Sequence, residues 1–244
     1  MKNLRTIYTR KFHGENDFSL EHMRKIIELA LESGYTFMTC REFMACDIAA
    51  LPKRVFIMKH DLDAKPDTLW PLLQLETEMG VKPTVYVRVC APDYNVMSLR
   101  VMPELVWWQN YGVEFGLHTN FVEYTKLAEV GQDINNTQLL RAEVQLLKNF
   151  LDIRGMSTHR DLNYAYNALP WLEEHWDDLK DVLDLDYQAY DPKLMDNTIY
   201  VNEGYSPHLC WRNITPEEAI ATGKHIYMLT HPHWWWVTNP FESY

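Results

Sequence analysis

The residues of this sequence that could do chemistry gather first in IMKHDLDA, residues 57–64, where two aspartates lie one residue apart. Side chains alternate between the faces of a β-strand, so a strand here places Lys59, Asp61 and Asp63 on one face. Two carboxylates held this close repel each other unless a cation or a shared proton separates them. The pair therefore indicates a functional site. A simpler alternative is that Asp63 caps the helix that follows it.

Other side chains that bind metals or transfer protons follow later apolar segments in the same way. His118 is the second-last residue of the segment VEFGLHT, His159 and Arg160 follow a segment near 153–158, and His231 follows HIYMLT. One histidine at such a place is more often a hydrogen-bonded structural residue than a ligand. Four predicted strand ends that each carry such a group instead indicate one site, because barrel enzymes place their chemistry at the carboxyl ends of strands.

The elements that must position these residues alternate between helix and strand. Helices are expected where apolar residues recur at helical spacing, and strands where β-branched and aromatic residues form short runs. The expected helices cover 20–33, 67–79, 99–110, 137–150 and a segment beginning at Pro216 after the N-cap Thr215; the expected strands cover 35–39, 54–60, 84–89, 113–119, 153–158, 183–188, 197–202 and 225–230. This alternation predicts a parallel α/β fold. The strand count and the absence of a G-x-G-x-x-G turn favour a closed barrel over an open dinucleotide-binding sheet.

Length and composition limit the classes of protein that this chain can belong to. Its 244 residues suit a single α/β domain over 1–244, in which 1–52 form a helix and strand packed on the barrel. A formal charge of -11 disfavours nucleic acid and anionic membranes as partners. No apolar run reaches the roughly 20 residues of a membrane span, and residues 1–17 lack the apolar core of a signal peptide. We expect a cytoplasmic protein with a small-molecule or glycan substrate, and a homo-oligomer remains open.

Four short motifs carry a resemblance to a known family. KHDLDA, GVEFGLHT, STHRD and LTHPHWW occur in this order at the predicted strand ends. In that order they resemble the polysaccharide deacetylase superfamily, carbohydrate esterase family 4, in its branch with H-D-x-D in place of T-F-D-D. The resemblance implies a distorted (β/α)7 TIM-like barrel. It also implies a divalent metal, zinc first, with iron, cobalt or nickel as alternatives, and hydrolysis of an N-acetyl or O-acetyl group on a sugar.

The resemblance also implies roles for individual residues. Asp61 matches the general base, Asp63 the metal-binding aspartate and His118 the first histidine ligand. Arg160 matches the arginine that orients the base, and His231 matches the general acid. The chemistry agrees with these roles, because a bound metal lowers the pKa of water and polarises a carbonyl group while an acid and a base move protons.

The metal ligands depart from the family at one position. The family places a second histidine four residues after the first, and here that position is Val122. A catalytic zinc normally has three protein ligands, so His159 is the expected third ligand, with Glu123 and Asn120 as weaker candidates. Two other functions remain open: removal of formyl or hydrolysis of another C–N bond on the same barrel, and carbohydrate binding without hydrolysis.

Candidate substrate contacts lie beside the proposed acid and base. Trp234, Trp235 and His233 closely follow His231, and flat aromatic rings at a pocket rim suit the faces of sugars. Tryptophans that seal the barrel or a dimer interface are an equal alternative. Lys59 shares the face of Asp61, where it could form a buried ion pair or act on the substrate.

Overall fold

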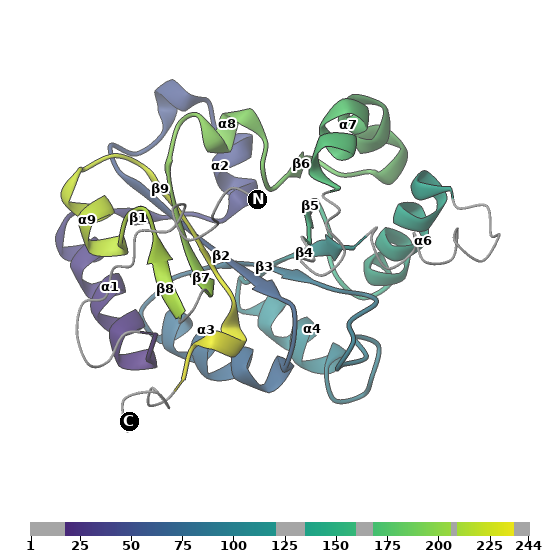
Figure 1. The fold of residues 1–244 in the computed structure, drawn as a ribbon, viewed down its shortest axis with the longest axis horizontal. Coiled ribbons are helices and arrows are strands. Elements are labelled where there is room, and N and C mark those ends of the chain that lie inside the picture. The colour runs from purple at the N-terminus through teal and green to yellow at the C-terminus, as the bar shows by residue number, and fades with distance from the viewer. Residues whose placement is uncertain (1–17, 121–134, 160–167, 206–208, 237–244) are drawn as a thin grey trace, which may run out of the picture.

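The computed structural model describes residues 18–120, 135–159, 168–205 and 209–236 (Figure 1). Its helices are α1 (Leu20–Glu32), α2 (Cys40–Ala45), α3 (Leu69–Glu78), α4 (Met102–Asn110), α6 (Asn136–Lys148), α7 (Leu169–Leu183), α8 (Pro192–Met195) and α9 (Pro216–Ala221). Its strands are β1 (Thr36–Phe37), β2 (Val55–Leu62), β3 (Thr84–Val87), β4 (Glu114–Thr119), β5 (Gly155–Thr158), β6 (Tyr187–Gln188), β7 (Ile199–Tyr205), β8 (Leu209–Arg212) and β9 (Ile226–Thr230). None of the described helices combines the length and apolar character of a membrane span.

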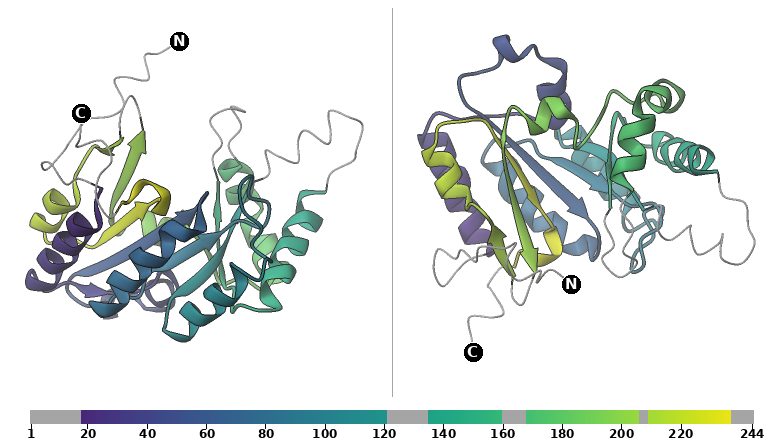
Figure 2. Two further views of the ribbon diagram at one scale, coloured as in Figure 1. Left: turned by 90° about the horizontal axis from the view of Figure 1, so that it is seen from below. Right: turned by 45° about the horizontal axis from the view of Figure 1, so that its top comes forward.

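The strands form one curled sheet in the order β6-β5-β4-β3-β2-β9-β7-β8, with β1 pairing beside the start of β2. Every pairing is parallel except that of β7 with β8. Figure 2 shows the sheet curving like half a barrel. The α/β class is confirmed, but a closed (β/α)7 barrel is not shown, because no pairing joins β6 to β8 in the described residues. At one edge β6 has only two residues, and at the other β8 turns back against β7.

The central strand β2 carries the two aspartates that the sequence singles out. All eight of its residues are buried, because β3 and β9 pair with its opposite edges and packed clusters cover both faces. Phe56 and Met58 face the outer layer of helices, whereas Val55 and Ile57 face the inside of the curl. Alternation along the strand therefore carries Asp61 to the inside as well.

Helices cover the outer face of the sheet in two groups. The helices α1, α3 and α9 pack with one half of the sheet, and α3, α4, α6 and α7 pack with the other half (Figures 1 and 2). The short helices α2 and α8 instead cover the inside of the curl at its base. The inner face at the carboxyl ends of the strands is thus left for the candidate residues.

Two glycines allow large aromatic rings to lie against the inside of the sheet. A Cβ atom on Gly116 would lie 2.6 Å from the ring of Tyr86, and one on Gly155 would lie 2.2 Å from Cζ of Tyr187. The two tyrosines join through their hydroxyl groups at 3.0 Å, and the Tyr187 hydroxyl donates to Oε1 of Glu114 at 2.6 Å. This buried, hydrogen-bonded layer of Tyr86, Tyr187 and Glu114, here called the tyrosine floor, lies beneath the strand ends.

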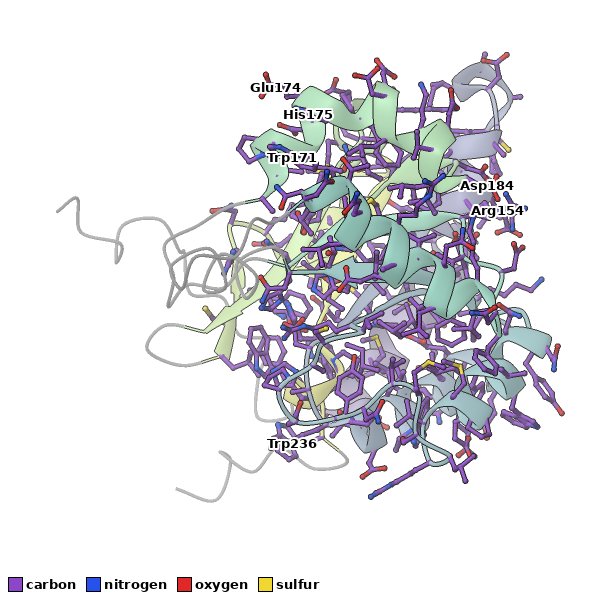
Figure 3. The ribbon with its side chains drawn as sticks, turned by 90° about the vertical axis from the view of Figure 1, so that its right-hand side faces the viewer. Arg154, Trp171, Glu174, His175, Asp184 and Trp236 are labelled. Atoms are coloured by element: carbon purple, nitrogen blue, oxygen red, sulfur yellow. The ribbon has the colours of Figure 1, made fainter. Side chains whose placement is uncertain are left out.

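The boundaries differ most from the sequence prediction between 169 and 212. The segment 183–188 is predicted as one strand, but α7 runs to Leu183 and only Tyr187–Gln188 form β6. Asp184 ends the helix in the left-handed conformation and pairs with Arg154 at 3.0 Å, and Figure 3 shows these two side chains close together. The sequence also gives no prediction of β8, whose pairing with β7 is a tertiary contact. The helix capped by Thr215 is confirmed, with a capping box at its start.

Candidate metal and catalytic site

The candidate residues that the structure describes lie at the carboxyl ends of parallel strands. Asp61 is near the end of β2 and Asp63 follows that strand, His118 is in β4, His159 follows β5 and His231 follows β9. Parallel strands bring these ends to one edge of the sheet, which is where barrel enzymes hold their active sites. Five polar groups from four separate segments of the sequence therefore meet at this edge.

Asp63, His118 and His159 each bring one ligand atom to the same point. Nε2 of His118 and Nδ1 of His159 each lie 3.0 Å from Oδ1 of Asp63, and the two nitrogens are 3.2 Å apart. Ligand atoms about 2 Å from one tetrahedral zinc ion lie about 3.3 Å apart, so the triangle has the size of three zinc ligands. Oδ1 of Asp63 is buried and has no well-aligned hydrogen bond among the described residues. The donor set therefore fits a divalent cation.

The ionisation of these groups suits metal binding. Burial lowers the pKa of His118, and its Nδ1 lies 3.3 Å from the backbone carbonyl of Ser157. A neutral imidazole that donates from Nδ1 to this carbonyl leaves the Nε2 lone pair facing the triangle. Burial works to raise the pKa of Asp63, but the close imidazoles of His118 and His159 hold it well below its usual value. The set thus offers one carboxylate and a neutral imidazole from His118.

His159, the third ligand expected from the sequence, brings its Nδ1 to this triangle. Its side chain is about as exposed as that of Asp63, at 15% against 17%, so both face the open side of the site. Asn120, a weaker candidate, is buried. Val122, Glu123 and Arg160 lie outside the described residues.

Asp61 lies beside the triangle but is held differently from Asp63. Its Oδ2 accepts a hydrogen bond from Nζ of Lys59 at 2.9 Å and is 3.8 Å from Nε2 of His118. Its Oδ1 is buried with no hydrogen-bond partner among the described residues. Burial works to raise the pKa of Asp61, but Lys59, His118 and His231 lower it below its ordinary value. The carboxylate is thus ionised, with one oxygen held and the other available as a base.

His231 faces the site from the opposite side, and Glu203 supports it. Nε2 of His231 is 3.6 Å from Oδ2 of Asp63, and Nδ1 is 3.5 Å from Oε2 of Glu203. Glu203 also accepts a hydrogen bond from the backbone N–H of His231 at 2.8 Å. Burial opposes protonation, but Glu203 and Asp63 raise the pKa of His231 above its ordinary value. Sequence analysis missed Glu203, although an acidic residue directly after the predicted strand 197–202 fits the strand-end pattern used for the others.

The aromatic run after His231 divides into a structural part and a part near the site. Trp235 is 2% exposed, packs against Phe18, and donates from Nε1 to Glu203 at 2.8 Å, which fits the alternative that it seals the fold. Trp234 is half-buried with its ring 4.4 Å from that of His231. Burial and the charge of His231 lower the pKa of His233 to about 4. Trp234 and neutral His233 therefore remain candidate substrate contacts.

Comparisons with known proteins identify a fold neighbour. No family model matches the chain, and no curated protein matches it. Among solved structures, it is similar to the Streptococcus pyogenes deacetylase PplD in complex with acetate, with a TM-score of 0.52 and 14% sequence identity over 84% of this chain and 87% of that one. The chain therefore shares the fold of this deacetylase.

Proposed function

We propose that this chain is a metal-dependent hydrolase that removes an N-acetyl or O-acetyl group from a sugar-containing substrate. The observation that carries the proposal is the triangle of Asp63, His118 and His159, with Asp61 and His231 both beside it. A binding site alone needs no base opposite an acid. The deacetylase-like fold supports the same reaction class.

The side chains suit the proton transfers of amide or ester hydrolysis. When bound, a divalent cation held by Asp63, His118 and His159 would lower the pKa of water and polarise the acyl carbonyl. Asp61 would accept the proton of the attacking water at Oδ1, since Oδ2 is held by Lys59. His231 would donate a proton to the departing amine or alcohol, and its raised pKa favours the protonated form that this role needs.

We infer that the cation is zinc, because two imidazole nitrogens and one carboxylate oxygen form a typical catalytic zinc set. Iron, cobalt and nickel accept the same donors. Substitution of the family's second histidine by Val122 favours the alternative of a binding protein without activity. His159 weakens that alternative, since it supplies a third donor at the required distance.

The proposal is tested by measuring bound metal in protein purified without chelator, by mass spectrometry. We expect near-stoichiometric metal in the wild type and loss of most of it in both His118→Ala and His159→Ala. His175→Ala is the matched control, because His175 lies on α7 against Trp171 (Figure 3) and should retain the metal. Full metal content in both site variants would contradict the assigned ligands.

The reaction is tested with the same wild-type protein on a panel of acetylated and formylated sugars. Faster turnover of the acetylated members would support deacetylation, and faster turnover of the formylated members would support the alternative acyl group. Binding of sugars without turnover of any member of the panel, by protein loaded with metal, would favour the carbohydrate-binding alternative.

A further inference from the structure

Two aspartates on the same face of one chain segment have different surroundings at this site. Both approach Nε2 of His118, Asp63 at 3.0 Å and Asp61 at 3.8 Å. Only Asp63 places an oxygen in the triangle of ligand atoms. A carboxylate as close as that of Asp61 would be expected to join a cation bound there, because hard cations and zinc readily accept carboxylate oxygens. Another group must therefore hold the carboxylate of Asp61 away from the metal position.

The side chain that restrains Asp61 is Lys59. Nζ of Lys59 donates to Oδ2 of Asp61 at 2.9 Å, and this is the oxygen that faces His118. Side-chain exposure is 0% for Lys59 and 4% for Asp61, so water does not compete for the pair. Removal of one partner from such a buried pair leaves an uncompensated charge, which is strongly unfavourable.

The surroundings of Lys59 fix its ammonium group in this position. Nζ also donates to the hydroxyl of Tyr190 at 3.3 Å. It lies 4.7 Å from the ring centre of Tyr190 and 5.2 Å from that of Tyr86, within the range of cation–π attraction. Tyr86 in turn belongs to the hydrogen-bonded tyrosine floor. These contacts hold the ammonium group of Lys59 in place, so it would stay behind if the carboxylate of Asp61 turned.

We propose that Lys59 is a positioning residue that keeps Asp61 out of the metal's ligand set and directs its free oxygen, Oδ1, to the water that attacks the substrate. The proposal rests on the proposed function, because it assigns Asp61 the part of the base. The family resemblance gives the orienting role to Arg160, whereas in the described residues Lys59 makes the ion pair with the base. Without this ion pair, Oδ2 would turn toward His118 and become a further ligand.

The test compares cobalt binding by metal-free wild type and Lys59→Met, because cobalt absorbs visible light according to its coordination number. We expect Lys59→Met to bind Co²⁺ about 10-fold or more tighter, with weaker absorption bands that indicate an added ligand. The double variant Lys59→Met/Asp61→Asn should return both the affinity and the spectrum toward those of the wild type, since the added carboxylate is gone. Lys59→Arg should resemble the wild type, because the cation is retained.

Turnover supplies a second measurement. It would change differently if Lys59 only stabilised the fold. With equal metal loading, kcat of Lys59→Met should fall about 100-fold or more while KM stays within about twofold, as expected when a general base is misplaced. Lys59→Arg should recover most of kcat. Tyr190→Phe is the matched control, because it removes the other hydrogen-bond partner of Lys59 and leaves the ion pair with Asp61.

A folded Lys59→Met variant with the cobalt affinity and spectrum of the wild type would overturn the proposal. If this variant fails to fold by circular dichroism, Lys59→Gln replaces it, because the amide is neutral but still polar, and the same shift in cobalt affinity is expected. The cobalt measurement separates this proposal from the proposed function. A wild type that binds cobalt but hydrolyses no acylated sugar would contradict the function and leave the effect of Lys59 on the ligand set measurable.

Discussion

At the scale of single residues, the site depends on side chains that touch neither the candidate cation nor a substrate. Lys59 holds one oxygen of Asp61, the carbonyl of Ser157 orients His118, and Glu203 holds His231. Each of these partners lies on a strand or directly pairs with one, so its position is set by the sheet. The groups in the site are therefore arranged before any ligand binds, which is what precise proton transfer requires.

The pairing of His231 with Glu203 predicts a specific pH dependence. In the proposed reaction the general acid His231 must be protonated, so kcat/KM should fall as the pH rises through its pKa, which lies above the ordinary value of 6.5. Replacement of the carboxylate in Glu203→Gln removes a cause of the raised pKa. The alkaline limb of the pH profile should then move to lower pH by about one unit.

The measurement is kcat/KM against pH for the wild type and Glu203→Gln at equal metal loading. Trp235→Phe is a matched control, because it removes the other side-chain hydrogen bond to Glu203 and leaves the negative charge beside His231. An alkaline limb that stays in place in Glu203→Gln would mean that another group is the acid.

At the scale of elements, the positions of the site residues depend on the packing of β4 and β5 against the tyrosine floor. β4 and β5 each contain a glycine where a tyrosine ring lies against the backbone. The same strands carry His118 and lead into His159. Any displacement of these strands would therefore change the triangle of ligand atoms.

The glycine in β5 supplies a test of this arrangement. A Cβ atom on Gly155 would lie 2.4 Å from the hydroxyl oxygen of Tyr187, which is fully buried and hydrogen-bonded to Glu114 and so cannot move aside. Gly155→Ala should lower the free energy of unfolding by about 1–3 kcal/mol and weaken metal binding through His159. Urea denaturation and metal titration measure the two effects.

A second glycine provides the control for that substitution. A Cβ atom on Gly204 would also meet a side chain, but that side chain is the long one of Arg212, which has several rotatable bonds. Gly204→Ala should therefore be less destabilising than Gly155→Ala. Equal losses of stability would show that the tyrosine floor is not the reason for the glycine in β5.

The sequence predicts the strand ends well because alternation along a strand is a local rule. Asp61 and Asp63 could be placed on one face of β2 from their spacing, and the histidines could be placed at later strand ends. Closure of the barrel could not be predicted in this way, since it depends on whether the two edge strands meet. The hairpin of β7 and β8 and the contact of Glu203 with His231 also arise from tertiary pairing, which short motifs do not encode.

At the scale of the whole molecule, the first and last described residues pack against each other. Phe18 is 1% exposed; its ring stacks on Trp211 with centroids 5.0 Å apart and meets Trp235 edge-on at 5.5 Å. The backbone N–H of Leu20 donates to the carbonyl of Trp236 at 2.8 Å. Since Trp235 also donates to Glu203, this aromatic cluster supports the residue that holds His231.

Loss of the packing of Phe18 against Trp211 and Trp235 should therefore destabilise the molecule strongly. Phe18→Ala removes a buried ring and leaves a cavity, so we expect the free energy of unfolding to fall by about 3–5 kcal/mol in urea denaturation. Phe150→Ala is the control, because Phe150 is 49% exposed and should cost less than about 1 kcal/mol. Similar losses for both variants would contradict a special role for the Phe18 cluster.

The place of β9 in the sheet has a consequence for biosynthesis. This strand comes from residues 226–230, yet it lies between β2 and β7 in the middle of the sheet. A ribosome makes the chain from its N-terminus, so the edge of β2 that pairs with β9 has no partner during most of translation. An open edge of a buried apolar strand invites pairing with other chains. We expect nascent chains that stall before residue 226 to aggregate or to bind chaperones. Only chains in which β9 has left the ribosome should complete the sheet.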